Sequence, residues 1–99
     1  MREKDKVEGQ ATLRLTVIVA NPLGLHARAA AKFVEAAGAF EAEIEVAKNG
    51  TVVSGKSIHG LMMLAAGPGS ELELRARGDD ARAALDRLAR LVSEGFDGD

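Results

Sequence analysis

The apolar residues of this chain switch repeatedly between a strand-like period of two and a helical period, and the order of these periods constrains the fold most. Alternation predicts four strands, which begin near Ala11, Ala42, Thr51 and Leu72. Helical spacing predicts three amphipathic helices, which cover residues 27–37, 58–65 and 79–95. The predicted order of elements is therefore β-α-β-β-α-β-α.

One face of nearly every predicted strand is polar, so helices can cover the sheet on one side only. Asn49-Gly50 joins two alternating runs and is a strong signal for a hairpin. The chain is therefore predicted to be an α/β (α+β) protein, an open-faced β-sandwich with a four-stranded, mostly antiparallel sheet and three helices on one face. We expect residues 11–99 to form this single domain. Residues 1–10 carry three basic and three acidic side chains and are predicted to be a flexible extension.

Composition excludes several classes of function. Thirteen basic against fifteen acidic residues give a net charge of −2, which argues against nucleic acid as a partner. The absence of cysteine excludes disulfides and thiolate chemistry and fits a reducing compartment. No apolar run is long enough to span a bilayer, so we expect a cytoplasmic protein without membrane insertion. We expect a monomer because the covered sheet leaves no further strongly apolar face.

His26 is the strongest candidate for a chemical role. It follows a turn sequence at residues 21–24 and stands at the start of the first predicted helix. Amides at a helix N-terminus lack partners within the helix and attract anions, so this position favours a neutral, nucleophilic imidazole. Arg28 adds a guanidinium group suited to phosphoryl or carboxylate oxygens. A histidine that merely caps the helix explains the local pattern equally well.

Ser57 occupies the predicted N-cap of the second helix. A capping hydroxyl there contributes on the order of 1 kcal/mol. A phosphate at the same place is compatible with the helix dipole, so capping and modification can coexist. The preceding Gly55-Lys56 completes the end of a P-loop pattern, but its upstream glycine would be Gly50, in the predicted hairpin turn. The P-loop match is therefore formal only.

The second predicted helix carries more apolar residues than one core-facing stripe needs. Leu61, Leu64 and Ala65 form its predicted core stripe. Ile58 and Met62, four residues apart, lie on a different side. A wider buried face is the ordinary explanation, whereas an exposed Ile/Met patch would suit a surface that several partners share.

The two segments, N-P-L-G-L-H-A-R at residues 21–28 and G-K-S-I-H-G-L-M at residues 55–62, together resemble the HPr family of bacterial phosphotransferase systems. The resemblance covers residues 12 to about 96. It implies that His26 accepts a phosphoryl group at Nδ1 from phosphorylated enzyme I, itself charged by phosphoenolpyruvate. The group then passes to an EIIA domain, in systems that serve sugar transport. Such a protein is a carrier turned over by its partners and not an enzyme.

The resemblance also assigns roles to other residues. Arg28 and the backbone amides of Ala27 and Arg28 would hold the phosphoryl group. Ser57 would be the regulatory site of an ATP-dependent HPr kinase/phosphorylase, in bacteria that have one. The predicted partner surface consists of Leu25, Ile58, His59 and Met62. No cofactor and no bound metal are expected.

Two residues depart from the family pattern. Ala29 stands where a proline usually follows the arginine, and it restores a backbone N–H that can contact a phosphate or loosen the turn. His59 replaces a residue that is usually hydrophobic, so the predicted partner surface is smaller. An imidazole there could make docking depend on pH, although a tolerated surface substitution is the simpler explanation.

Three other functions compete with a sugar-system phosphocarrier. The first is a carrier of a nitrogen-related or regulatory phosphotransferase branch, which the C-terminal Gly95-Phe96-Asp97 faintly favours. The second is a non-catalytic module of the same fold, in which His26 only caps the helix. An independent enzyme is the weakest alternative because one nucleophile without a second acid/base group cannot sustain turnover.

Overall fold

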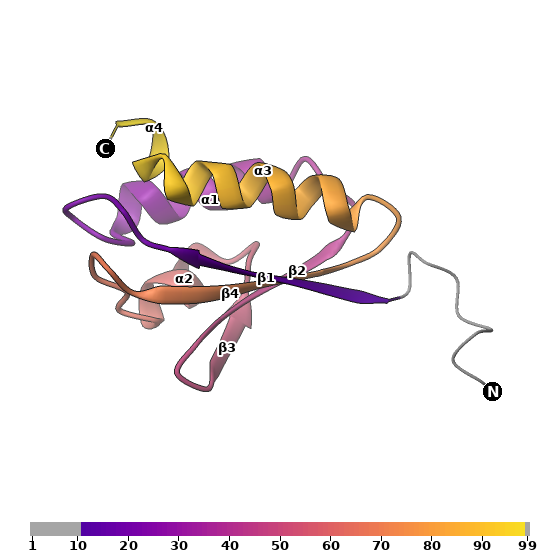
Figure 1. The fold of residues 1–99 in the computed structure, drawn as a ribbon, viewed down its shortest axis with the longest axis horizontal. Coiled ribbons are helices and arrows are strands. Elements are labelled where there is room, and N and C mark those ends of the chain that lie inside the picture. Colours follow the sequence, from indigo (N-terminus) through magenta and orange to yellow (C-terminus); the bar gives the residue numbers. More distant parts are fainter. Residues whose placement is uncertain (1–10, 99) are drawn as a thin grey trace.

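The computed structural model describes residues 11–98 and confirms the predicted order of elements (Figure 1). The predicted extension at residues 1–10 lies outside the described residues. In chain order the elements are β1 (Thr12–Ile18), α1 (Ala27–Ala37), β2 (Glu43–Lys48), β3 (Thr51–Ser54), α2 (Ile58–Met63), β4 (Glu71–Arg77), α3 (Ala81–Ser93) and α4 (Gly95–Gly98). The short turn α4 is the one element that the periodicity did not predict.

The four strands form one antiparallel sheet in the order β1-β4-β2-β3. Asn49 and Gly50 both adopt positive φ angles, of 49° and 87°, and connect β2 to β3 as the predicted two-residue hairpin. Lys48 therefore pairs directly with Thr51. This geometry excludes a P-loop at Gly50, because that motif requires a loop between a strand and a helix.

The two faces of the sheet differ as the alternation predicts. Leu72, Leu74 and Ala76 of β4 are buried beneath α1 and α3, which lie across one face (Figure 1). α2 packs against α1 and β3. On the open face, the Arg75 side chain bonds Glu73 at 2.7 Å. The open-faced β-sandwich is confirmed.

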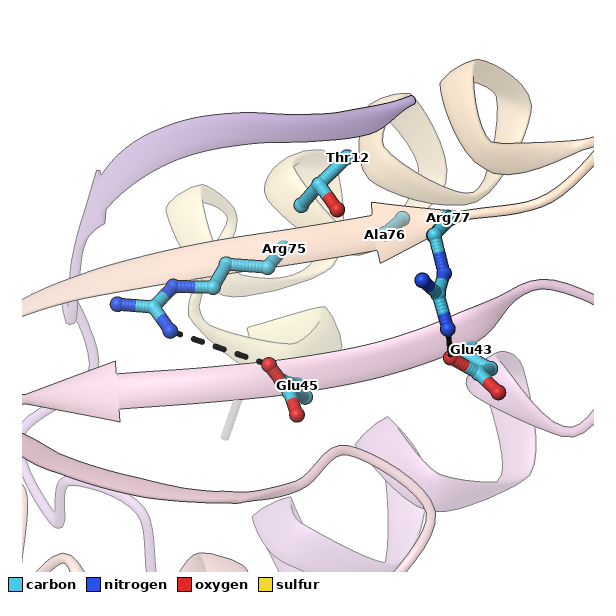
Figure 2. A pocket seen from close by; sticks show the side chains of 6 residues that line it. All are labelled: Thr12, Glu43, Glu45, Arg75, Ala76 and Arg77. Atoms are coloured by element: carbon cyan, nitrogen blue, oxygen red, sulfur yellow. Dashed lines mark hydrogen bonds and ion pairs between the residues drawn. The ribbon is translucent and has the colours of Figure 1, made fainter. Parts of the chain in front are cut away.

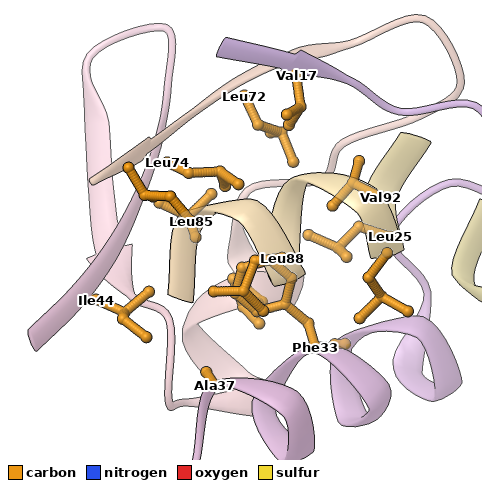
Figure 3. Close-up of a cluster of buried hydrophobic side chains, with 14 of the residues drawn as sticks. Val17, Leu25, Phe33, Ala37, Ile44, Leu72, Leu74, Leu85, Leu88 and Val92 are labelled. Carbon is orange, nitrogen blue, oxygen red and sulfur yellow. The ribbon is translucent and has the colours of Figure 1, made fainter. Parts of the chain in front are cut away.

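The core lies between the sheet and the two long helices (Figure 3). Phe33 of α1 and Leu88 of α3 are fully buried, as is Phe96 of α4. Their burial depends on amphipathic helices whose apolar stripes face the sheet. Leu15 of β1 lies opposite Leu74 but stays partly exposed, since β1 is an edge strand.

The second helix is shorter than the sequence predicts. It ends at Met63 instead of residue 65, because Ala65 adopts a left-handed conformation with φ of 51° that no α-helix continues. Ala65 is exposed, so its predicted place in the core stripe is wrong. Ala66 is buried in its stead, whereas Leu61 and Leu64 occupy the core as predicted.

Asp80 joins the start of α3 to the connection between α1 and β2. Its carboxylate accepts hydrogen bonds from the backbone amides of Glu41 and Ala42, each at 2.9 Å. Gly78 permits the close approach, because a Cβ atom at this position would lie 2.9 Å from Cα of Ala42. The predicted helix-opening aspartate therefore holds a neighbouring segment and makes no side-chain cap bond to its own helix.

We predict that Asp80→Ala lowers the free energy of unfolding by about 2 kcal/mol, since two backbone amides lose a charged acceptor. Asp79→Ala is the matched control, because Asp79 is the exposed neighbour of Asp80. Urea unfolding of both variants measures the difference. Equal stability of the two variants would contradict the structural role of Asp80.

Candidate functional site

His26 forms the N-cap of α1 and uses its imidazole as the capping group. Nδ1 accepts a hydrogen bond from the backbone N–H of Arg28 at 3.2 Å. The backbone carbonyl of His26 accepts from the N–H of Ala30 at 2.8 Å. Because Nδ1 accepts this hydrogen bond, its lone pair points toward the first turn of the helix. The predicted capping role is thus present at the same residue as the predicted nucleophile.

The loop before His26 is held against the segment that follows α2. The Leu25 N–H donates to the Ala66 carbonyl at 2.8 Å. Gly24 has a φ of +68°, and a Cβ atom there would lie 2.5 Å from the same carbonyl oxygen. Only glycine therefore fits this close contact. The loop enters α1 from a fixed direction.

The first turn of α1 is suited to hold an anion. It contains no acidic residue, and its helix begins with the amides of Ala27, Arg28 and Ala29. The Arg28 side chain is exposed beside them, whereas the Ala29 side chain is fully buried. Unpaired charge at a helix N-terminus is positive, so a phosphoryl group on the imidazole would meet N–H donors and a guanidinium group.

Ser57 caps α2 as predicted. Its Oγ accepts a hydrogen bond from the backbone N–H of Gly60 at 2.9 Å, and its side chain is partly exposed. Gly60 lies close to this cap, with a hypothetical Cβ atom 3.3 Å from Ser57 Oγ. A group attached to Oγ would therefore project from the start of the helix next to exposed residues.

Three of the four predicted partner residues are on the surface, and one is not. Ile58, His59 and Met62 are exposed. Leu25 is only 6% exposed and lies among the buried side chains between the helices (Figure 3). Its assignment to a partner surface is wrong, because a side chain that fills the core cannot dock into another protein.

Two exposed apolar residues were missed by the sequence analysis. Leu23 is 69% exposed and Met63 is 65% exposed. The position of Leu23 between a proline and a glycine in a turn is a signal that it projects from a loop tip. Met63 follows His59 by four residues and so shares its side of the helix. Seven large apolar side chains are exposed among the described residues, and four of them lie on the His26 loop and on α2. We call these four, Leu23, Ile58, Met62 and Met63, the apolar patch.

The open face of the sheet carries a shallow hollow that none of the predicted site residues lines (Figure 2). Arg75 faces Glu45 across it at 3.8 Å, and Arg77 bonds Glu43 at 2.6 Å. These charges satisfy one another, so the hollow offers no unpaired group for catalysis.

Within residues 11–98, no three His, Cys, Asp or Glu side chains gather where they could hold a metal ion. Over the same range, no helix is long and apolar enough to cross a membrane.

Comparisons with known proteins give one family. The model of the family "PTS HPr component phosphorylation site" matches residues 13–94. The phosphocarrier protein HPr of Pseudomonas aeruginosa is 46% identical over 84 residues, which cover 84% of this chain and 93% of the relative. The phosphocarrier protein NPr of Shewanella violacea is 44% identical over 85 residues, with 86% and 93% covered.

The fold agrees with this relationship. A crystal structure of HPr from Thermoanaerobacter tengcongensis superimposes with a TM-score of 0.84 at 38% sequence identity. The superposition covers 88% of this chain and 98% of the other. The chain therefore belongs to the HPr family, the phosphocarrier proteins of the phosphotransferase system.

Proposed function

We propose that this chain accepts a phosphoryl group on Nδ1 of His26 from phosphorylated enzyme I and passes it to an EIIA domain. The observation that carries the proposal is the hydrogen bond from the Arg28 N–H to His26 Nδ1. It places a lone pair of the imidazole beside helix amides that stabilise negative charge. The chain acts as a carrier, and its partners complete the turnover.

The proposed transfer is an in-line displacement at phosphorus. The Nδ1 lone pair of His26 forms a P–N bond while the bond from phosphorus to the phosphorylated group of enzyme I breaks, and that group keeps the bonding electron pair. The Arg28 N–H, which donates to Nδ1 at 3.2 Å, then donates to a phosphoryl oxygen instead. Transfer onward to the EIIA domain reverses the same movements. The phosphorylated nitrogen follows from the family resemblance and from the position of this amide.

The Arg28 guanidinium and the amides of Ala27 and Ala29 would share the charge on the equatorial oxygens. Preorganised donors of this kind lower the barrier because they need no reorientation during transfer. Ala29 adds an amide where proline would have none. The loop contacts of Gly24 and Leu25 with Ala66 keep the imidazole at the helix start while charge moves.

The apolar patch is the proposed docking surface for both the donor and the acceptor. Ile58 and Met62 keep the role that the sequence predicts, while Leu23 and Met63 replace the buried Leu25. Flexible methionine side chains can pack against surfaces of different shape. Four exposed apolar side chains suit a modest interface that dissociates quickly, as a carrier between two partners requires. Exposed His59 lies beside the patch and would contact the same partners.

We predict that the wild-type chain gains one acid-labile phosphoryl group when incubated with phosphoenolpyruvate, Mg²⁺ and enzyme I. His26→Ala should gain none, because it lacks the attacking nitrogen, whereas His59→Ala should still gain one. Intact-mass measurement before and after mild acid gives the result. A wild type that stays unmodified, beside an active enzyme I and a second carrier, would contradict the proposal.

Ser57 is the proposed regulatory site for an HPr kinase/phosphorylase in hosts that have one. Its Oγ already bonds the Gly60 amide, so a phosphate there would remain at the helix N-terminus. It would add about −1.5 to −2 charges beside Ile58 of the apolar patch. Docking would then require desolvation of that charge, which weakens the interface.

We predict that Ser57→Asp slows phosphoryl transfer from enzyme I several-fold, chiefly through a higher KM for the carrier. Asn49→Asp is the matched control, because it adds the same charge at the exposed hairpin turn between β2 and β3. Steady-state transfer rates over a range of carrier concentrations measure the effect. Equal KM values for the two variants would count against regulation through this surface.

A carrier of a nitrogen-related or regulatory branch is the second candidate function. The 44% identity to a phosphocarrier named NPr supports it, since the similarity extends beyond proteins named HPr. Rates of transfer from this chain to EIIA domains of sugar and regulatory systems would separate the two.

We further propose that residues 11–99 act as one monomeric carrier domain in the cytoplasm, where these partners work.

A further inference from the structure

Asn21 is the one buried polar residue among those described, and it lies at the base of the loop that delivers His26. Its side chain is only 2% exposed. The Asn21 Nδ2 donates to the Gly24 carbonyl at 2.7 Å, and the Gly24 N–H donates to the Asn21 carbonyl at 3.1 Å. Burial of a polar side chain is costly unless it makes such bonds, so this position has a specific role in the loop.

The Asn21 bond and a second bond hold one peptide group from both sides. The peptide between Gly24 and Leu25 has its carbonyl bound by Asn21 Nδ2 and its N–H bound by the Ala66 carbonyl at 2.8 Å. The Leu25 side chain is buried in the core. The next residue is His26. The orientation of the backbone at His26, and with it the position of the imidazole, therefore depends on this peptide and its two hydrogen bonds.

The C-terminal turn α4 packs against Asn21. A Cβ atom on Gly95 would lie 3.5 Å from Cβ of Asn21, so the two residues are in contact. Lys32 of α1 donates from Nζ to the Phe96 carbonyl at 3.0 Å, and Phe96 is fully buried. Figure 1 shows α4 at the same end of the molecule as the loop before α1. The turn thus connects Asn21 to the helix that His26 caps.

We propose that Asn21 is a positioning residue for phosphoryl transfer through His26, an inference that rests on the proposed function. Its amide fixes the Gly24–Leu25 peptide and, through it, the alignment of His26 Nδ1 with the Arg28 N–H. Without the amide donor, the Gly24 carbonyl loses a bond and this peptide can rotate. Small displacements of a reacting group cost large factors in rate, because in-line geometry is required.

The test compares Asn21→Leu and Asn21→Ala with the wild type. Leucine keeps nearly the shape of asparagine and removes the amide, so it separates hydrogen bonding from packing. Both variants should lower kcat for phosphorylation by enzyme I about tenfold. The KM should stay unchanged, because the apolar patch is intact. Asp80→Ala serves as the stability control, since it weakens the fold at Glu41 and Ala42 and should transfer at the wild-type rate.

A second readout does not depend on enzyme I. The ¹⁵N–¹H resonance of the Arg28 amide and the ¹⁵N resonances of the His26 ring report the hydrogen bond between them directly. They should shift in both Asn21 variants and not in Asp80→Ala. Wild-type kcat and unshifted resonances in Asn21→Leu would overturn the inference. A wild-type chain that takes no phosphoryl group at all would instead contradict the proposed function, and the inference with it.

Discussion

The site depends on one hydrogen bond, in which a histidine side chain replaces the usual serine, threonine or aspartate as a helix cap. The Arg28 N–H donates to Nδ1 of His26 at 3.2 Å. This bond serves the fold, because it satisfies an amide that the helix leaves without a partner. It also serves the proposed chemistry, because the same amide can bond a phosphoryl oxygen once Nδ1 is occupied. The Arg28 amide therefore holds the capping imidazole before phosphorylation and would hold the phosphoryl group after it.

The interactions that stabilise the fold involve other residues than those proposed for phosphoryl transfer. Interactions that hold the layers together, such as the Asp80 carboxylate on the amides of Glu41 and Ala42, lie away from the His26 loop. The open face of the sheet pairs its own charges, as Arg77 does with Glu43. Around His26, the structure combines a clamped loop, helix amides and exposed apolar side chains. A carrier needs this combination, since it must hold a reactive group rigidly and its partners only briefly.

Sequence patterns predicted most of the fold because alternation and helical spacing report directly on which side of an element is buried. They predicted the bounds of α1, the Asn49-Gly50 hairpin and the buried face of β4. They failed where burial depends on contacts between distant segments. Leu25 is buried where its N–H bonds the Ala66 carbonyl, a contact between segments about forty residues apart that no local pattern indicates. The left-handed conformation of Ala65 has no signal in its residue type, and the role of Asn21 becomes visible only with its contacts.

In the proposed function, phosphorus bonds the imidazole nitrogen of His26 that faces the helix. The most direct test is a ³¹P and ¹⁵N NMR measurement on the chain labelled with ¹⁵N in its two histidines and phosphorylated by enzyme I. We predict coupling between phosphorus and Nδ1 of His26, together with a downfield shift of the Arg28 amide as it bonds a phosphoryl oxygen. Coupling to Nε2 of His26, or phosphorus on His59, would contradict the account.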